Sequence, residues 1–142
     1  MAFRMHRVQV WSGDIPDRPG AAAGILECLA HAGVDLEFVI TRPRRGEPTQ
    51  STIFLAPIDE TEHGAAARAA GLTPARDTAM LCVEGDNRPG LGYEIMSRLA
   101  VAGINLRGLS VSTFEKRFAC YLAFDNADDL ALAIQLLAGV HE

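Results

Sequence analysis

The sequence has few of the features that mark a secreted or membrane-embedded protein. Its three cysteines, Cys28, Cys82 and Cys120, are odd in number and widely spaced, so we expect buried reduced thiols rather than disulfides or metal ligands. No apolar run is long enough to span a bilayer, and the start, MAFRMHRVQVW, has no apolar signal-peptide segment. We therefore expect a cytoplasmic protein with no membrane association.

Positive charge is also scarce, since the formal net charge is −5. This balance argues against a nucleic-acid partner, whose phosphates require basic surfaces. The one basic cluster is Arg42, Arg44 and Arg45 in TRPRRGEPTQ, where Pro and Gly predict a loop between two strands. Two interpretations stand for this cluster: a solvated hairpin tip, or a contact with an anion or an acidic partner.

Patterns typical of catalysis are absent. The histidines His6, His31, His63 and His141 lack metal-ligand spacing, GDNRPGLG lacks the Gly-Lys-Ser/Thr ending of a phosphate-binding loop, and no Gly-x-Ser-x-Gly elbow occurs. Cys82 and Cys120 sit in apolar strand patterns, which favours burial over reactivity. We expect no enzymatic activity, no metal and no cofactor.

What the sequence does contain is an internal repeat. Residues 18–36 read RPGAAAGILECLAHAGVDL and residues 88–106 read RPGLGYEIMSRLAVAGINL, and nine of the nineteen aligned positions are identical. The offset of seventy residues is too long for a solenoid repeat and suits a small domain. We predict two modules, residues 1–77 and 78–142. Each is near the lower size limit for independent stability, so we expect the modules to bury surface against each other and against a second chain, giving a homodimer.

The first copy predicts a strand at Val8 and Val10, a turn over SGDIPDRPG and a helix from Pro19 to a left-handed stop at Gly33. Asp17 is placed to accept the free N–H groups of that helix. Alternating apolar residues predict strands over 34–40 and 52–56, and an Ala-rich segment predicts a helix over 60–70. A short fourth strand falls within 72–77.

The second copy repeats this order. It predicts a strand over 78–84, a turn at GDNRPG, a helix ending at Gly103, and a strand from Ile104 whose apolar phase shifts at Gly108, as at a bulge. A strand around 118–124 and a final helix capped by Asn126 follow.

Each copy therefore has the order β-α-β-β-α, which predicts an α+β fold. A final strand would complete the ferredoxin-like βαββαβ sandwich, an antiparallel sheet with two helices on one face. The second copy lacks that last strand, because only Val140, His141 and Glu142 follow its final helix. Since open sheet edges are usually paired or covered, we predict that strand 78–84 pairs with the N-terminal segment or with a partner chain.

The repeated motif resembles the ACT domain. The resemblance is carried by Asp17-Arg18-Pro19-Gly20 with Ala32-Gly33-Val34-Asp35-Leu36, and by Asn87-Arg88-Pro89-Gly90-Leu91 with Ala102-Gly103-Ile104-Asn105-Leu106. It covers nearly the whole chain as two modules in tandem. The departures are the missing last strand and Ala21-Ala22-Ala23, where a bulkier apolar residue often follows Pro-Gly in the family.

The resemblance implies a ligand site in the first β-α turn and at the start of the second strand. Carried over, its residues are Asp14, Asp17, Arg18, Gly20 and Asp35 in the first module, and Asp86, Asn87, Arg88, Gly90, Leu91 and Asn105 in the second. A helix N-terminus suits a carboxylate, glycines allow close approach, and the acidic and amide groups suit an ammonium group. The alternative is structural: Asp17 and Asn87 as caps and Pro-Gly as turn chemistry. Asn87 and Asn105 make the second module the better candidate.

Three functions follow as hypotheses. The first, implied by the resemblance, is a non-catalytic regulatory protein that binds a small molecule, an amino acid above all, at an interface between modules or subunits. The second is a ligand-free interaction subunit of a metabolic enzyme. The third is a small enzyme on a ferredoxin-like scaffold, which fold analogy alone does not exclude.

Overall fold

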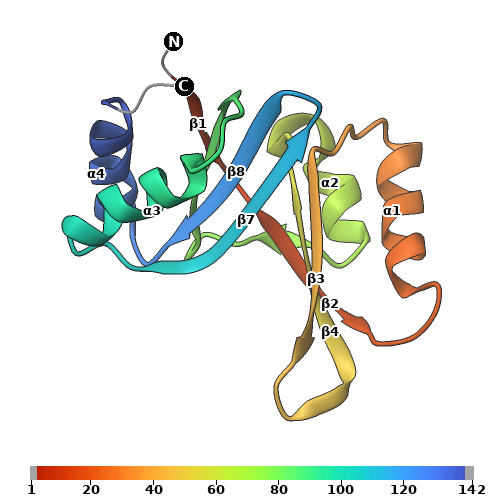
Figure 1. Cartoon of the computed structure of the whole chain (residues 1–142). Coiled ribbons are helices and arrows are strands. Elements are labelled where there is room, and N and C mark those ends of the chain that lie inside the picture. The colour runs from red at the N-terminus through yellow and green to blue at the C-terminus, as the bar shows by residue number, and fades with distance from the viewer. Residues whose placement is uncertain (1–2, 140–142) are drawn as a thin grey trace. The chain divides into compact units, whose positions relative to one another are not determined.

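The computed structural model describes residues 3–139, which form eight strands and four helices (Figure 1). The chain divides into two units. The contiguous unit is Gln9–Arg76, and the split unit combines Met1–Val8 with Asp77–Glu142. This division differs from the sequence-based one, residues 1–77 and 78–142, chiefly in the N-terminal segment, which belongs with the second copy.

The contiguous unit is a four-stranded antiparallel sheet with two helices. Its elements are β2 (Trp11–Pro16), α1 (Ala21–His31), β3 (Phe38–Arg44), β4 (Glu47–Ala56), α2 (Glu60–Ala69) and β5 (Thr73–Pro74). The strand order is β3-β4-β2-β5. Leu29 of α1 and Ala67 of α2 pack in one core with Trp11, Ile53 and Leu55 of the sheet. These three sheet residues share a face of the ladder, so both helices cover that face.

The split unit has the same architecture. Its elements are β1 (Arg4–Val8), β6 (Ala79–Asp86), α3 (Leu91–Val101), β7 (Leu106–Phe114), β8 (Arg117–Phe124) and α4 (Ala127–Leu137). The strand order is β1-β6-β8-β7, and all pairs are antiparallel. Together the two sheets confirm the predicted α+β fold with βαββαβ modules, the second of which is completed from the start of the chain.

The N-terminal strand β1 takes the position that the second copy's own last strand would have filled. It pairs with β6 from Arg4 opposite Glu84 to Val8 opposite Met80. Just before it, Phe3 is 8% exposed and packs in the core of the split unit. Of the two predicted partners for strand 78–84, the N-terminal segment is therefore confirmed. The residues after α4 that motivated the prediction, Val140–Glu142, lie outside the described part of the chain.

The predicted start of the first module was wrong. Instead of one strand at Val8 and Val10 followed by a turn, β1 ends at Val8 and β2 runs from Trp11 to Pro16. Glycine occupies position 13 of this strand because the backbone just before β5 passes close to it. A Cβ at Gly13 would lie 2.7 Å from the Gly71 carbonyl oxygen, so a side chain does not fit there.

Helix α1 begins at Ala21, two residues later than the predicted Pro19, and α3 begins at Leu91, the first apolar residue of its predicted helix face; both helices end as expected. Gly33 and Gly103 have φ of 82° and 75°, which confirms the left-handed stops. The residue after each glycine still bonds back to its helix: the Val34 N–H donates to the Leu29 carbonyl at 3.0 Å. Val34 therefore belongs to the C-terminal turn of α1, and β3 begins later, at Phe38.

Two further local predictions are confirmed. The pairing of β7 with β8 shifts register between Leu106 and Gly108, which is the bulge expected at that glycine. The Asn126 side chain accepts a hydrogen bond from the Asp129 N–H at 2.8 Å and so caps α4. None of the helices within residues 3–139 has the length and apolar character needed to cross a bilayer.

Candidate functional site

In the contiguous unit, the candidate site begins at the turn from β2 into α1. The Asp17 N–H donates to the Thr49 carbonyl at 2.8 Å, which ties the turn to β4. Gly20 is the N-cap residue of α1 and has a φ of 87°, a left-handed conformation that favours glycine. A Cβ added to Gly20 would meet no atom within 4 Å. The backbone in front of α1 is therefore open to its surroundings.

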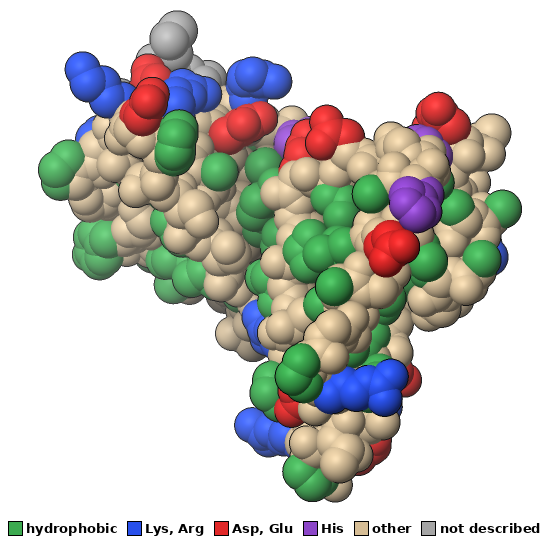
Figure 2. Space-filling model, turned by 90° about the vertical axis from the view of Figure 1, so that its right-hand side faces the viewer, with side chains coloured by type: hydrophobic (Ala, Val, Ile, Leu, Met, Phe, Trp, Pro, Cys, Tyr) green, Lys and Arg blue, Asp and Glu red, His purple; other side chains and the backbone are tan. Residues whose placement is uncertain are grey.

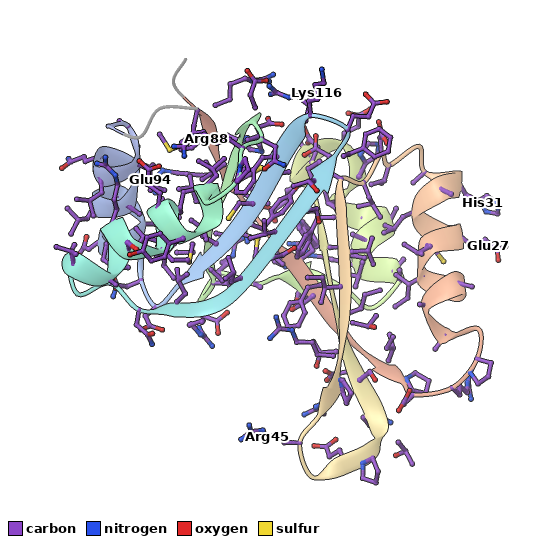
Figure 3. All side chains as sticks on the ribbon, in the orientation of Figure 1. Glu27, His31, Arg45, Arg88, Glu94 and Lys116 are labelled. Carbon is purple, nitrogen blue, oxygen red and sulfur yellow. The ribbon has the colours of Figure 1, made fainter. Side chains whose placement is uncertain are left out.

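The split unit repeats this geometry at the turn from β6 into α3. The Asn87 N–H donates to the Lys116 carbonyl at 2.8 Å, and Lys116 lies at the tip of the β7–β8 hairpin (Figure 3). Gly90 is the N-cap residue with a φ of 84°, and it too has open space where a Cβ would be. The duplication therefore extends to a tethering hydrogen bond and to the backbone dihedral angle of the N-cap residue.

Each helix leaves N–H groups free in its first turn. Neither N-cap glycine supplies a side-chain acceptor, and no described residue accepts a hydrogen bond from the N–H groups of Ala22 and Ala23, or of Gly92 and Tyr93. The predicted cap at Asp17 was wrong, because Gly20 occupies the cap position. Free N–H groups and the helix dipole make both turns favourable surroundings for a carboxylate or another anion.

The polar side chains near the first turn are exposed. Asp14 lies on β2, and its carboxylate is 3.2 Å from Arg44, which also reaches Glu47 at 3.3 Å. Figure 2 shows basic and acidic side chains together on the lower projection, which Figure 1 identifies as the β3–β4 hairpin. Arg44 of the basic cluster is thus paired with carboxylates, while Arg45 projects from the hairpin tip (Figure 3).

Two other predicted residues of the contiguous unit, Arg18 and Asp35, are exposed. No carboxylate among the described residues lies within ion-pair distance of Arg18, and no basic group lies within that distance of Asp35. The α1 first turn also holds no acidic residue. An incoming anion would therefore meet no carboxylate in the first turn of α1, and Arg18 beside it forms no ion pair with a described residue.

The second turn differs, because its charged side chains are already paired with each other. Asp86 lies 2.6 Å from Arg117, the residue opposite it on β8. Arg88 is hydrogen-bonded to Glu94 on α3, and the two lie side by side in Figure 3. Glu94 also lies 3.8 Å from Arg98. A ligand bound here would have to share or replace these ion pairs.

The remaining predicted residues of the split unit differ in accessibility. Asn87 and Asn105 are exposed, with amide groups available to a ligand. Leu91, by contrast, is 1% exposed and packs in the core with Ile95 and Leu99. Its N–H is also engaged, at 3.3 Å from the Arg88 carbonyl. Leu91 therefore anchors the turn, and its side chain is not available for a ligand.

Solved structures match this chain along its length, whereas no protein-family model and no curated protein matches it. The chain is similar to protein BT0572 from Bacteroides thetaiotaomicron, with a TM-score of 0.77 and 12% identity over 94% of this chain and 88% of that one. It is also similar to the ligand-free regulatory subunit of aspartate kinase from Thermus thermophilus, with a TM-score of 0.68 and 19% identity over 100% and 98% of the two chains.

A third similar structure is E. coli aspartokinase III in complex with lysine and aspartate, with a TM-score of 0.54 and 12% identity. That match covers 100% of this chain and 33% of the enzyme chain. Regulatory subunits or domains of aspartate kinase recur among the similar structures. The likeness to the first two structures runs through both units of this chain. The chain has the tandem ACT fold.

Within this tandem ACT fold, sequence reasoning found the turns but missed their ion-pair partners. Arg117 faces Asp86 only because β6 and β8 pair in a particular register, which the sequence does not specify. Only a weak sign in the sequence marks Glu94 as such a partner: it lies in the first turn of α3, at the position where α1 has Gly24. Arg44 was noted in the basic cluster but not as the partner of Asp14.

Neither ACT module displays a constellation typical of catalysis in its described residues. No group of three metal-ligating side chains is found there. Cys120 is completely buried, and burial together with the nearby Cys82 raises its pKa to about 12, so the thiol stays protonated and unreactive at neutral pH. Three of the similar solved structures are regulatory subunits or a putative regulatory domain of aspartate kinase.

Proposed function

We propose that this chain is a non-catalytic regulatory protein that binds an amino acid at its β-α turns. The ligand would lie at an interface between modules or between subunits of a homodimer, and a metabolic enzyme would respond to its binding. The observation that carries the proposal is the full-length likeness to a regulatory subunit of aspartate kinase, 100% of this chain against 98% of that one. The identity of 19% leaves the ligand itself open.

The geometry of the turns supports an amino acid as the ligand class. Free N–H groups at the start of each helix suit an α-carboxylate, and the N-cap glycines leave room for it to approach. The exposed amides of Asn87 and Asn105 offer carbonyl oxygens to an α-ammonium group, as do the carboxylates of Asp17 and Asp35. Each turn thus combines the two kinds of groups that a zwitterion requires.

A thermal-shift screen against the twenty amino acids tests this proposal. At a concentration a hundred times the Kd, a ligand stabilises the folded state by about 2.7 kcal/mol. For a chain of this size the melting temperature should rise by roughly 5–10 °C. Asn87→Ala and Asn105→Ala should reduce the shift if the split unit binds. Asp17→Ala and Asp35→Ala, at the matching positions of the contiguous unit, serve as the paired control.

A second function is favoured by one observation. The charged groups of the second turn already satisfy each other through Asp86–Arg117 and Arg88–Glu94, which suits a surface that binds no ligand. In that case the chain is an interaction subunit of a metabolic enzyme. No thermal shift with any amino acid, together with stoichiometric co-purification of an enzyme, would support this alternative and overturn amino-acid binding.

A further inference from the structure

The β3–β4 hairpin of the contiguous unit is longer than its equivalent, the β7–β8 hairpin of the split unit. In the split unit, the Lys116 carbonyl that tethers the β-α turn comes ten residues after Leu106, the end of the repeat. In the contiguous unit, the tethering carbonyl of Thr49 comes thirteen residues after Leu36. The three additional residues are not needed for the ACT fold, because the split unit forms the same sheet without them.

The additional length lies at the tip of the hairpin, beyond the tether. In the split unit the tethering carbonyl belongs to the tip itself, whereas the β3–β4 hairpin turns earlier, at Arg45 and Gly46, between the paired residues Arg44 and Glu47. Figure 1 shows this tip extending past the turn that leads into α1. We call residues 42–48 the hairpin arm.

The hairpin arm is braced against the sheet. The guanidinium of Arg44 lies 3.2 Å from the carboxylate of Asp14 on β2 and 3.3 Å from that of Glu47. Pro43 and Pro48 each fix one backbone φ angle on the two sides of the turn. A pre-organised segment loses less conformational entropy when it binds a partner than a flexible loop does.

The arm carries positive charge that the rest of the chain does not neutralise. It contains three arginines and one carboxylate, in a chain whose net charge is −5. Arg44 is occupied by its two carboxylates, but neither Arg42 nor Arg45 forms an ion pair with a described residue. Both side chains are exposed, and Figure 3 shows Arg45 pointing away from the hairpin.

We propose that the hairpin arm docks on an acidic segment of a partner protein, whose carboxylates pair with Arg42 and Arg45. Arginine suits this role because its planar guanidinium binds a carboxylate through two parallel hydrogen bonds. The inference rests on the proposed function only in that it requires a partner protein such as a metabolic enzyme. It does not depend on a ligand at the β-α turns.

The distribution of charge favours a protein partner over a nucleic acid. Two free arginines offer few contacts to phosphates, whereas binding to a nucleic acid draws its affinity from many. The contiguous unit as a whole has nine carboxylates against six arginines, so a long polyanion would be repelled beyond the arm. A short acidic segment of a protein needs to reach only the tip.

Fluorescence anisotropy with a labelled peptide of about twelve glutamates, at low ionic strength, tests the proposal. The double variant Arg42→Gln with Arg45→Gln should bind this peptide at least about fivefold more weakly than the wild type, because two exposed ion pairs are lost. The matched control is Arg107→Gln with Lys116→Gln in the split unit. It removes the same charge from exposed side chains that form no ion pair with a described residue, and it should bind as the wild type does.

The single lysine of the chain, Lys116, allows the contact to be located. The double variant Arg45→Lys with Lys116→Arg keeps the charge and moves the only side-chain amine to the hairpin arm. A carbodiimide should then join this amine to a glutamate of the bound peptide through an amide bond, and mass spectrometry should locate the bond at position 45. The wild type, whose side-chain amine lies at the tip of the other hairpin, should not crosslink there.

Four results would overturn the proposal. These are no binding of the peptide by the wild type, equal loss of binding in the two glutamine double variants, crosslinking at Lys116 of the wild type as strong as at position 45, and tighter binding of a single-stranded DNA of similar length than of the peptide. A flat thermal-shift screen with amino acids would leave the peptide measurements untouched. Failure of the proposed ligand and failure of the docking arm are therefore distinguishable.

Discussion

Replacing Phe3 by Ala should destabilise the split unit, even though Phe3 precedes the contiguous unit in the sequence. Phe3 is 8% exposed and belongs to the same core cluster as Leu81, Val83 and Leu122. Truncating a buried Phe to Ala lowers the free energy of unfolding by about 3–5 kcal/mol, because apolar surface is no longer buried and a cavity is left behind. The free energy of unfolding of a small domain is only about 5–15 kcal/mol, so this loss is a large fraction of its stability. The melting temperature of this unit should fall by more than about 10 °C.

Hydrogen exchange followed by mass spectrometry tests where the loss occurs. Protection should fall in β6, β8, α3 and α4, and it should persist in β2, β4 and α1. Phe114→Ala is the matched control, because Phe114 is 78% exposed and its truncation removes little buried surface. The assignment of β1 to the split unit would be refuted by loss of protection in β2 and β4 with the split unit intact.

Four further outcomes follow from the local geometry and from the burial of Cys120. Gly13→Ala should lower the free energy of unfolding by about 1–3 kcal/mol in urea titrations, because its Cβ would lie 2.7 Å from the Gly71 carbonyl oxygen. Gly24→Ala should raise the free energy of unfolding by about 0.5–1 kcal/mol, because its Cβ would lie in open space on α1 and alanine favours the helix. Asn126→Ala should remove the α4 cap and cost about 1 kcal/mol, measured the same way. Because the pKa of Cys120 is raised from 9.0 to about 12, the unfolded chain loses that proton first, so stability should fall as the pH rises from 9 towards 12, and Cys120→Ala should flatten this slope.

Much of the fold could be predicted from the sequence because the local patterns are strong. Apolar residues at helical spacing defined α1 and α3, and Gly33 and Gly103 defined their ends. These features depend on backbone geometry within a few residues, which local sequence controls directly. The same holds for the bulge at Gly108.

The start of the first module could not be predicted in this way. Trp11–Pro16 reads as a turn because Gly13, Asp14 and Pro16 are turn formers, yet this segment is a strand paired with β4 and β5. Tertiary pairing overrides the local preference, and Gly13 is explained by the nearby Gly71 backbone rather than by a turn. The sequence did contain one sign of β1: the apolar residues Phe3 and Met5 alternate with polar residues ahead of Trp11.

The candidate site was predictable in its backbone and not in its side-chain partners. The repeated Arg-Pro-Gly pointed to both turns, and the N-cap glycines have nearly equal φ angles of 87° and 84°. Whether a turn carries ion pairs depends on contacts with other elements. Asp86 meets Arg117 across the ladder, whereas the equivalent pair in the contiguous unit is Pro16 and Gln50, which carry no charge.

The N-terminal strand also shows how the chain passes from one unit to the other. Strands β1 and β2 lie in different sheets, yet only Gln9 and Val10 separate them along the chain. Val10 is fully buried, and its carbonyl accepts the Ala75 N–H at 2.8 Å, so this connection is held in place. A second short connection, residues 75–78, joins β5 to β6. Each connection joins an outer strand of one sheet to the central strand that leads into a candidate turn in the other. The chain therefore passes between the two sheets through short segments at both crossings, and each crossing ends on the strand that positions a candidate turn.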